Sequence, residues 1–308
     1  MSVFEKAVRA PAAALLSVLL LSAPAAAPAQ ARPLFARPAA IPAGPAMWVI
    51  RDADSTIYLF GTVHVMKPGQ AWRSPRIDNA LASADELVLE IAEVDDDAAM
   101  IPIVTRLGLD PTHRLSERLT PEDKTRLDRV IAAMGANPAS FEPMRPWLAS
   151  LQISVGSLAR VGYAGDAGVD RALKASAVAA GKPVRAFETA EQQIHFFADM
   201  PPIMEMEMLR QSLDEFDDAP AVFGPLADGW LSGDLRALKR YLVDDWKREE
   251  PSLYRVLIVQ RNANWAKQIE AKLAGSGTSF IAVGAGHLVG PDSVQTQLAR
   301  HGIRSERY

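Results

Sequence analysis

Cysteine is absent from this chain of 308 residues, which excludes disulfide scaffolds, zinc–thiolate sites, iron–sulfur clusters and cysteine nucleophiles. Histidine is scarce, with five residues, so a metal site would combine a few imidazoles with carboxylates. There is no long basic stripe, and the formal net charge is −4, so nucleic acid is not an expected partner. Hydrophobic residues make up 49% and charged residues 23%, as in an ordinary globular protein with a sizeable core.

The first residues predict an export signal. Lys6 and Arg9 precede an apolar run over 12–21, which has signal-peptide length and covers about half of a membrane span. Small residues up to Ala31 fit a cleavage site. We therefore expect a signal peptide over 1–31, a periplasmic mature protein and no transmembrane span in the mature chain. An uncleaved N-terminal anchor is the alternative.

Short apolar runs alternate with helical patterns along the rest of the chain. The predicted strands cover 56–60, 86–89, 183–187 and 279–283, and the predicted helices cover 74–84, 121–134, 146–160, 168–180, 202–216 and 252–274. This alternation predicts an α/β fold with a small, mostly parallel central sheet flanked by many helices, with helical insertions between strands. We expect a flexible lead-in over 32–46, rich in proline and alanine, and a single domain over 47–308.

One motif occurs twice: an apolar strand followed by Gly-x-x-His, once from Gly61 to His64 and once from Gly284 to His287. Glycine allows a sharp turn at a strand end, where a Cβ atom would clash. The carboxyl edge of an open α/β sheet is also where ligands bind. Both imidazoles are therefore expected at one rim of the sheet.

The other two predicted strands end at Glu90 and Glu188. If the four strands are parallel, two imidazoles and one or two carboxylates emerge at the same edge. Such ligands suit Zn, Mn, Co or Fe, and the metal would lower the pKa of a bound water and polarise a carbonyl. The alternative for either glutamate alone is a helix cap or a surface ion pair.

Arg261 interrupts an apolar stripe that runs from Leu253 to Ile269 with a spacing of four. A cation in such a position must be paired or must face a polar cavity. Its forked donors suit an oxyanion or a substrate carboxylate. A structural ion pair with Glu90 or Glu188 explains the position equally well.

A methionine-rich stretch lies near Pro201. Copper binding is one interpretation, but methionine commonly fills irregular gaps, so packing in a core or a groove is expected. The stretch could also line a substrate groove. Its members are Met200, Met204, Met206 and Met208.

Together these segments resemble the TraB/PrgY/GumN family. The resemblance runs from about residue 47 to residue 308, and the paired Gly-x-x-His words, their flanks and their order make it specific. The family is similar to the TIKI metalloproteases, and more distantly to erythromycin-esterase-like and ChaN-like proteins. The segments that carry the resemblance are Trp48, 58–65, 86–90, 168–170, 181–189, 261–266 and 283–290.

The resemblance implies an α/β core and a hydrolytic, metal-dependent site. It implies that His64, Glu90 and His287 are the essential groups, that Arg261 is the family arginine, and that the metal is manganese or cobalt, with zinc as a further candidate. The resemblance says little about the substrate, because activity has been assigned only to some relatives.

The predicted function is that of an exported, metal-dependent, peptidase-like hydrolase acting on a peptide or a small amide. His64, Glu90 and His287 would bind the metal, and Arg261 would stabilise the oxyanion. Glu188 would be a general base or would orient another group. The alternative is a non-catalytic periplasmic protein that uses the same pocket to bind or scavenge a peptide, a signal or a metal.

Overall fold

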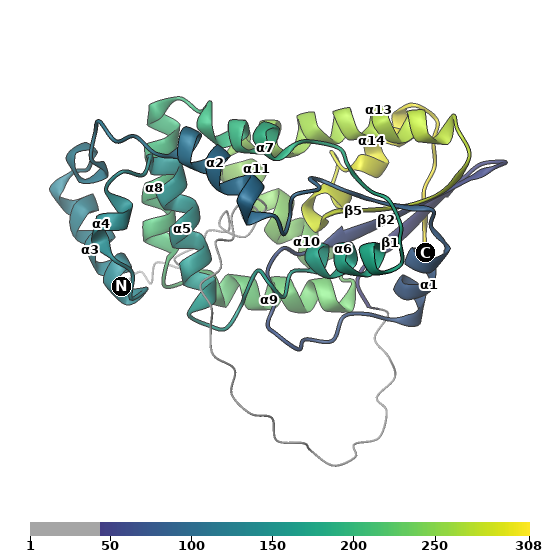
Figure 1. Ribbon diagram of the computed structural model, residues 1–308, viewed down its shortest axis with the longest axis horizontal. Coiled ribbons are helices and arrows are strands. Elements are labelled where there is room, and N and C mark those ends of the chain that lie inside the picture. The colour runs from purple at the N-terminus through teal and green to yellow at the C-terminus, as the bar shows by residue number, and fades with distance from the viewer. Residues whose placement is uncertain (1–43) are drawn as a thin grey trace, which may run out of the picture.

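A computed structural model describes residues 44–308 and contains a six-stranded sheet in the order β4-β3-β5-β2-β1-β6 (Figure 1). Four consecutive strands in this order pair in parallel with one another. They are β2 (Ser55–Thr62), β3 (Glu86–Leu89), β4 (Val184–Ala186) and β5 (Gly277–Gly284). Each corresponds to a predicted strand, so the expected α/β fold with a mostly parallel sheet is confirmed.

Two antiparallel strands at one edge were not predicted. β1 (Met47–Arg51) pairs with β2 as a hairpin, which Asp52 closes by donating its backbone N–H to the Ser55 carbonyl at 3.2 Å. β6 (Glu306–Arg307) then pairs with β1. A two-residue, exposed strand leaves no apolar run in the sequence, which is why the pattern did not reveal it.

Helices cover both faces of the sheet and form a further group beside it (Figure 1). The sheet-covering helices include α1 (Pro75–Ser83), α6 (Val169–Ala179), α9 (Ala219–Ser232), α10 (Leu235–Lys239), α13 (Arg261–Leu273) and α14 (Val294–Arg300). The adjoining group includes α2 (Asp97–Gly108), α3 (Pro121–Ala133), α4 (Pro138–Phe141), α5 (Pro146–Ala159), α7 (Ala190–Ala198) and α8 (Pro202–Glu215).

Apolar clusters hold these layers together. Ile281 of β5, Leu59 of β2 and Trp265 of α13 belong to the cluster between the sheet and the α13–α14 pair. Leu127 of α3 and Leu213 of α8 belong to a separate cluster inside the adjoining helical group. The helical insertions therefore have apolar packing of their own.

The predicted helix over 252–274 is present but is not a uniform α-helix. It consists of α12 (Pro251–Tyr254), a π-helical segment η3 (Arg255–Gln260) and α13. A second π-helical segment, η2 (Arg240–Asp244), precedes α11 (Asp245–Glu249). Wider π turns are found frequently at functional sites, and Arg261 follows η3 directly.

The predicted signal peptide over 1–31 lies outside the described residues, as does all but the last part of the predicted lead-in over 32–46. Within residues 44–308, no helix is both long enough and apolar enough to cross a bilayer.

Candidate functional site

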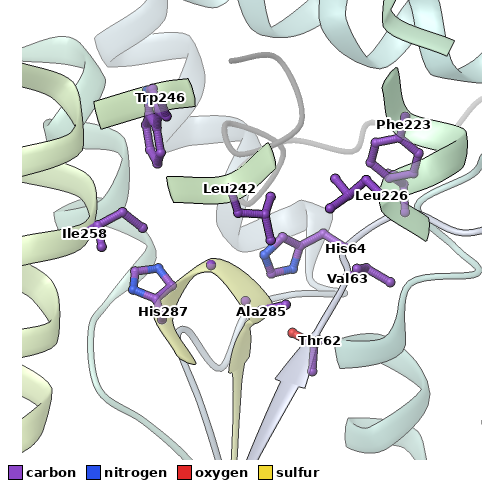
Figure 2. Close-up of a pocket in the computed structure, with 13 residues that line it drawn as sticks. Thr62, Val63, His64, Phe223, Leu226, Leu242, Trp246, Ile258, Ala285 and His287 are labelled. Carbon is purple, nitrogen blue, oxygen red and sulfur yellow. The ribbon is translucent and has the colours of Figure 1, made fainter. Parts of the chain in front are cut away.

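The ends of β2 and β5 bring the two motif histidines together. Thr62 and Gly284 are direct partners in the parallel ladder, and His287 lies on the 3₁₀-helix η4 (Ala285–Leu288) that follows β5. A Cβ atom added to Gly284 would lie 3.2 Å from Nε2 of His64 and 3.6 Å from Cδ2 of His287. Figure 2 shows the two imidazoles on either side of this turn. The expected convergence at one rim is present.

His64 is held in place by Asp170, a residue that the strand-end argument missed. Its Nδ1 lies 2.7 Å from one carboxylate oxygen of Asp170, and the Thr62 hydroxyl donates to the other at 2.7 Å. The preceding Gly168 lets α6 begin close to His64, because a Cβ there would lie 2.5 Å from the His64 carbonyl oxygen. The signal for Asp170 was its position in the 168–170 segment of the family resemblance.

His287 has a different set of partners. Its Nδ1 lies 2.6 Å from the side-chain oxygen of Asn262, and Nη1 of Arg261 donates to its Nε2 at 3.3 Å. This arrangement places the ring proton on Nδ1, since Nε2 acts as the acceptor. Asn262 is fully buried and also went unpredicted, because it occupies a helix position rather than a strand end.

The two imidazoles have opposite pKa shifts. Burial alone lowers the pKa of His64, but the carboxylates of Asp170 and Glu90 raise it to about 9. Burial lowers the pKa of His287 to about 3, with the charges of Arg261 and His64 adding to the effect and Glu90 opposing it. In the metal-free protein His64 therefore carries a proton at neutral pH, whereas His287 is neutral.

Glu90 lies between the two histidines as a buried carboxylate. Its Oε1 accepts the Gly284 backbone N–H at 2.7 Å, and its Oε2 accepts from Arg261 at 2.6 Å and from Gln193 at 3.1 Å. Burial raises the pKa of Glu90, but the charges of Arg261 and both histidines hold it well below the usual range. The group is therefore ionised.

Arg261 forms a structural ion pair, which was one of the two explanations for its position in the sequence. Its Nε contacts both oxygens of Glu188 at 3.0 and 3.1 Å, and Nη2 binds Glu188 at 2.8 Å as well as Glu90. Its Nη1 donates to the Leu257 carbonyl at 3.3 Å and to His287. Each of its five N–H groups thus has a protein acceptor. Glu188 also accepts from Trp265 at 2.9 Å and from Gln193 at 3.0 Å.

A cavity of about 50 Å³ lies between the imidazoles, which is room for a few water molecules. Figure 2 shows apolar side chains over the histidines. Such a wall limits the access of water and strengthens electrostatic interactions inside. The apolar lining consists of Val63, Val65, Phe223, Leu226, Leu242, Trp246, Ile258 and Ala285.

The donor atoms around Gly284 fit a divalent metal in their chemistry. Both histidines have Nδ1 fixed by an oxygen, which is the outer-shell arrangement of metal-binding histidines. Oε1 of Glu90 is the oxygen that Arg261 leaves free, and it lies 3.8 Å from Nε2 of His287. A Cβ atom on Gly284 would enter the space between these donor atoms, at 3.2 Å from Oε1 of Glu90.

The predicted three-residue metal set is nevertheless not preformed. In the part of the chain that the structure describes, no group of three or more His, Cys, Asp or Glu residues is arranged to hold a metal ion. If both histidines bound one metal ion through Nε2, Nη1 of Arg261 would have to leave Nε2 of His287. The two imidazoles fit the role of metal ligands better than Glu90 does. Glu90 as a third ligand stays a prediction.

The sequence matches the TraB/PrgY/gumN family over residues 46–307. It is 25% identical over 256 residues to the uncharacterized protein YbaP of Escherichia coli strain K12, covering 82% of this chain and 92% of that relative. It is 20% identical over 261 residues to an uncharacterized protein of Treponema pallidum strain Nichols, covering 80% and 78%. No solved structure matches. The chain belongs to the TraB/PrgY/gumN family.

Proposed function

We propose that this chain is a metal-dependent hydrolase that cleaves an amide bond, with peptides as the substrate class, in the cavity between His64 and His287. One observation carries the proposal: two imidazoles from distant parts of the sequence flank Gly284, and each is fixed through Nδ1. Nε2 is therefore the nitrogen for chemistry in both rings, and in His287 it becomes available when Nη1 of Arg261 leaves it. A surface or packing histidine does not need a buried partner of this kind.

The protein side chains would orient the reacting groups. Asp170 and Asn262 set the direction of the two rings, and Glu90 supplies a negative charge between them. Glu188 and Gln193 position Arg261 and Glu90 through hydrogen bonds. We therefore assign Glu188 an orienting role rather than that of a general base, since Oε1 already accepts from Trp265 and Oε2 from Arg261 and Gln193.

We propose that His64 and His287 hold a divalent metal through Nε2, with Glu90 beside it. A metal there would lower the pKa of water and polarise a carbonyl oxygen. Manganese or cobalt is favoured by the family resemblance, with zinc as a further candidate. Arg261 donates to His287 in the structure described here and would be the residue displaced. Its proposed role at the oxyanion depends on the same displacement, because that would free its Nη1.

Export to the periplasm is part of the proposal. It is supported by the basic residues, apolar run and small residues over 1–31. Fusion of residues 1–31 to a reporter that is active only after export tests this point separately. Reporter activity is expected with the native segment and should be lost when a charged residue replaces Leu16.

The activity test uses purified full-length chain, stripped of metal and reloaded with Mn²⁺, Co²⁺ or Zn²⁺, with cleavage of a peptide library followed by mass spectrometry. We expect hydrolysis with at least one metal, and a loss of at least about a hundredfold in His64→Ala and in His287→Ala. His301→Ala is the control, because His301 is exposed and paired with Glu270 at 2.9 Å. Turnover retained in both site variants would refute the assignment, and metal or peptide binding without turnover would favour the non-catalytic alternative.

A further inference from the structure

A second, much larger cavity has Glu188 among its lining residues. It has a volume of about 950 Å³, which is within the range of small-molecule sites. It is bounded by α7, the start of α8, the α12–η3 segment and α13. Figure 1 shows α7 and α13 near each other along one side of the molecule. The cavity surrounding the two histidines shares no lining residue with it.

The lining of this larger cavity is mostly apolar and rich in aromatic rings. Phe187 stacks on Trp265 at 5.4 Å between ring centroids, and Phe196 is also part of the lining. Met200 and Met204 of the methionine-rich stretch complete this surface. Flat rings and flexible thioethers together suit an aromatic or branched apolar group.

The acidic groups of the cavity already have partners. Glu188 is paired with Arg261 at 2.8 Å, and Glu191 with Arg106 at 2.6 Å. Asp199 lies 3.0 Å from Nδ1 of His195. None of these carboxylates therefore calls for a cationic ligand.

Lys267 is the charged group of this lining that lacks a partner. It projects from α13 and has no hydrogen bond or ion pair with any residue in the described range 44–308. An ammonium group at the edge of an apolar cavity complements an anion. Lys267 is therefore the charged group of this lining that is left to pair with a ligand.

We propose that the larger cavity binds a small organic molecule with an aromatic or branched apolar body and one anionic group. The body lies against Phe196, Met204 and Val256, which are partly exposed in the lining, and the anionic group faces Lys267. Behind this lining, the buried Trp265 donates to Glu188, and its ring centroid is 4.4 Å from that of His287, so the cavity borders residues that support the histidine site. The proposal does not depend on hydrolytic activity.

Two fluorescent probes that differ only in a sulfonate test the proposal on the full chain. They are 8-anilinonaphthalene-1-sulfonate and the neutral N-phenyl-1-naphthylamine. We expect the sulfonate probe to bind more tightly to the wild type. Lys267→Met should weaken its binding by about fivefold and change that of the neutral probe by less than about twofold. Lys124→Met on α3 is the control for loss of a lysine.

A cavity-filling variant tests the location. Val256→Trp should weaken both probes by at least about tenfold, and Ser252→Trp serves the same purpose if the first variant is not folded by circular dichroism. Val178→Trp, on an exposed position of α6, should leave both affinities unchanged. Equal affinity of the two probes for the wild type would overturn the anionic preference. Unchanged binding in a folded cavity-filling variant would overturn the site.

Discussion

At the scale of single residues, the environment gives two chemically identical side chains different protonation states. His64 is bonded to a buried carboxylate, which raises its pKa to about 9, whereas His287 is bonded to a neutral amide and lies beside Arg261, with its pKa lowered to about 3. The motif Gly-x-x-His is the same in both cases. What distinguishes the two histidines is the partner of Nδ1, Asp170 in one case and Asn262 in the other.

Gly284 provides a sharp test at this scale. In Gly284→Ala the new Cβ would lie 3.2 Å from both Oε1 of Glu90 and Nε2 of His64, so it would occupy the space in which the reacting groups meet. We expect peptide hydrolysis and metal binding to fall by at least about tenfold, because misplacement by about 1 Å costs up to a hundredfold. The measurement is turnover together with the metal content of the folded variant.

Gly286→Ala is the matched control, because its nearest neighbour is a Leu242 carbon at 3.6 Å, an ordinary contact. It should retain nearly wild-type turnover. Equal activity of the two alanine variants would contradict the placement of the site at Gly284.

Asp170→Asn tests how His64 is oriented. The amide keeps the size of the carboxylate but removes its charge, so the pKa of His64 should fall from its raised value. NMR titration of ¹⁵N-labelled histidine in the metal-free protein measures this shift. Thr62→Ser, which keeps the hydroxyl that donates to Asp170, should leave the titration close to wild type. An unchanged His64 titration in Asp170→Asn would show that the ion pair does not govern the ring.

At the scale of elements, one guanidinium connects α13 to the ends of two strands. Arg261 is 5% exposed and bonds Glu90 after β3 and Glu188 after β4. In Arg261→Gln both carboxylates would remain buried without their cation, so the free energy of unfolding should fall by about 3–5 kcal/mol. Urea denaturation measures this change.

The comparison for that variant is Arg126→Gln, which breaks an exposed pair with Asp214 between α3 and α8. Exposed pairs contribute about 0–1 kcal/mol, so little change is expected. A loss in Arg261→Gln no larger than that in Arg126→Gln would contradict the role of the buried network.

The start of β3 predicts a dependence of stability on pH. Burial raises the pKa of Glu86, but hydrogen bonds from Lys272 and Ser279 lower it below the ordinary 4.5 overall. A folded-state pKa below the unfolded value stabilises the protein above the unfolded pKa, and this contribution is lost as the pH falls through the folded value. Glu86→Gln should therefore cost about 1 kcal/mol at pH 7, with the difference shrinking as the pH falls below about 4. A difference independent of pH would show that the charge of Glu86 contributes nothing.

At the scale of the whole molecule, strand ends explain which parts of the site the sequence revealed. His64, His287, Glu90 and Glu188 follow parallel strands, so their meeting at one edge follows from topology. In the antiparallel part of the sheet, β6 was missed because it is an exposed strand of two residues, whereas the apolar residues of β1 were not recognised as a strand. The helix-borne partners of the histidines were missed because helical periodicity predicts which face is buried but not which distant side chain that face meets.

The proposed site requires that His64 and His287 bind the same metal ion. The most direct measurement is electron spin-echo envelope modulation of Mn²⁺ bound to protein with ¹⁵N-labelled histidine. We expect modulation from two imidazole nitrogens in the wild type and from one in each of His64→Ala and His287→Ala. Modulation from no imidazole, or the same modulation in all three proteins, would contradict it.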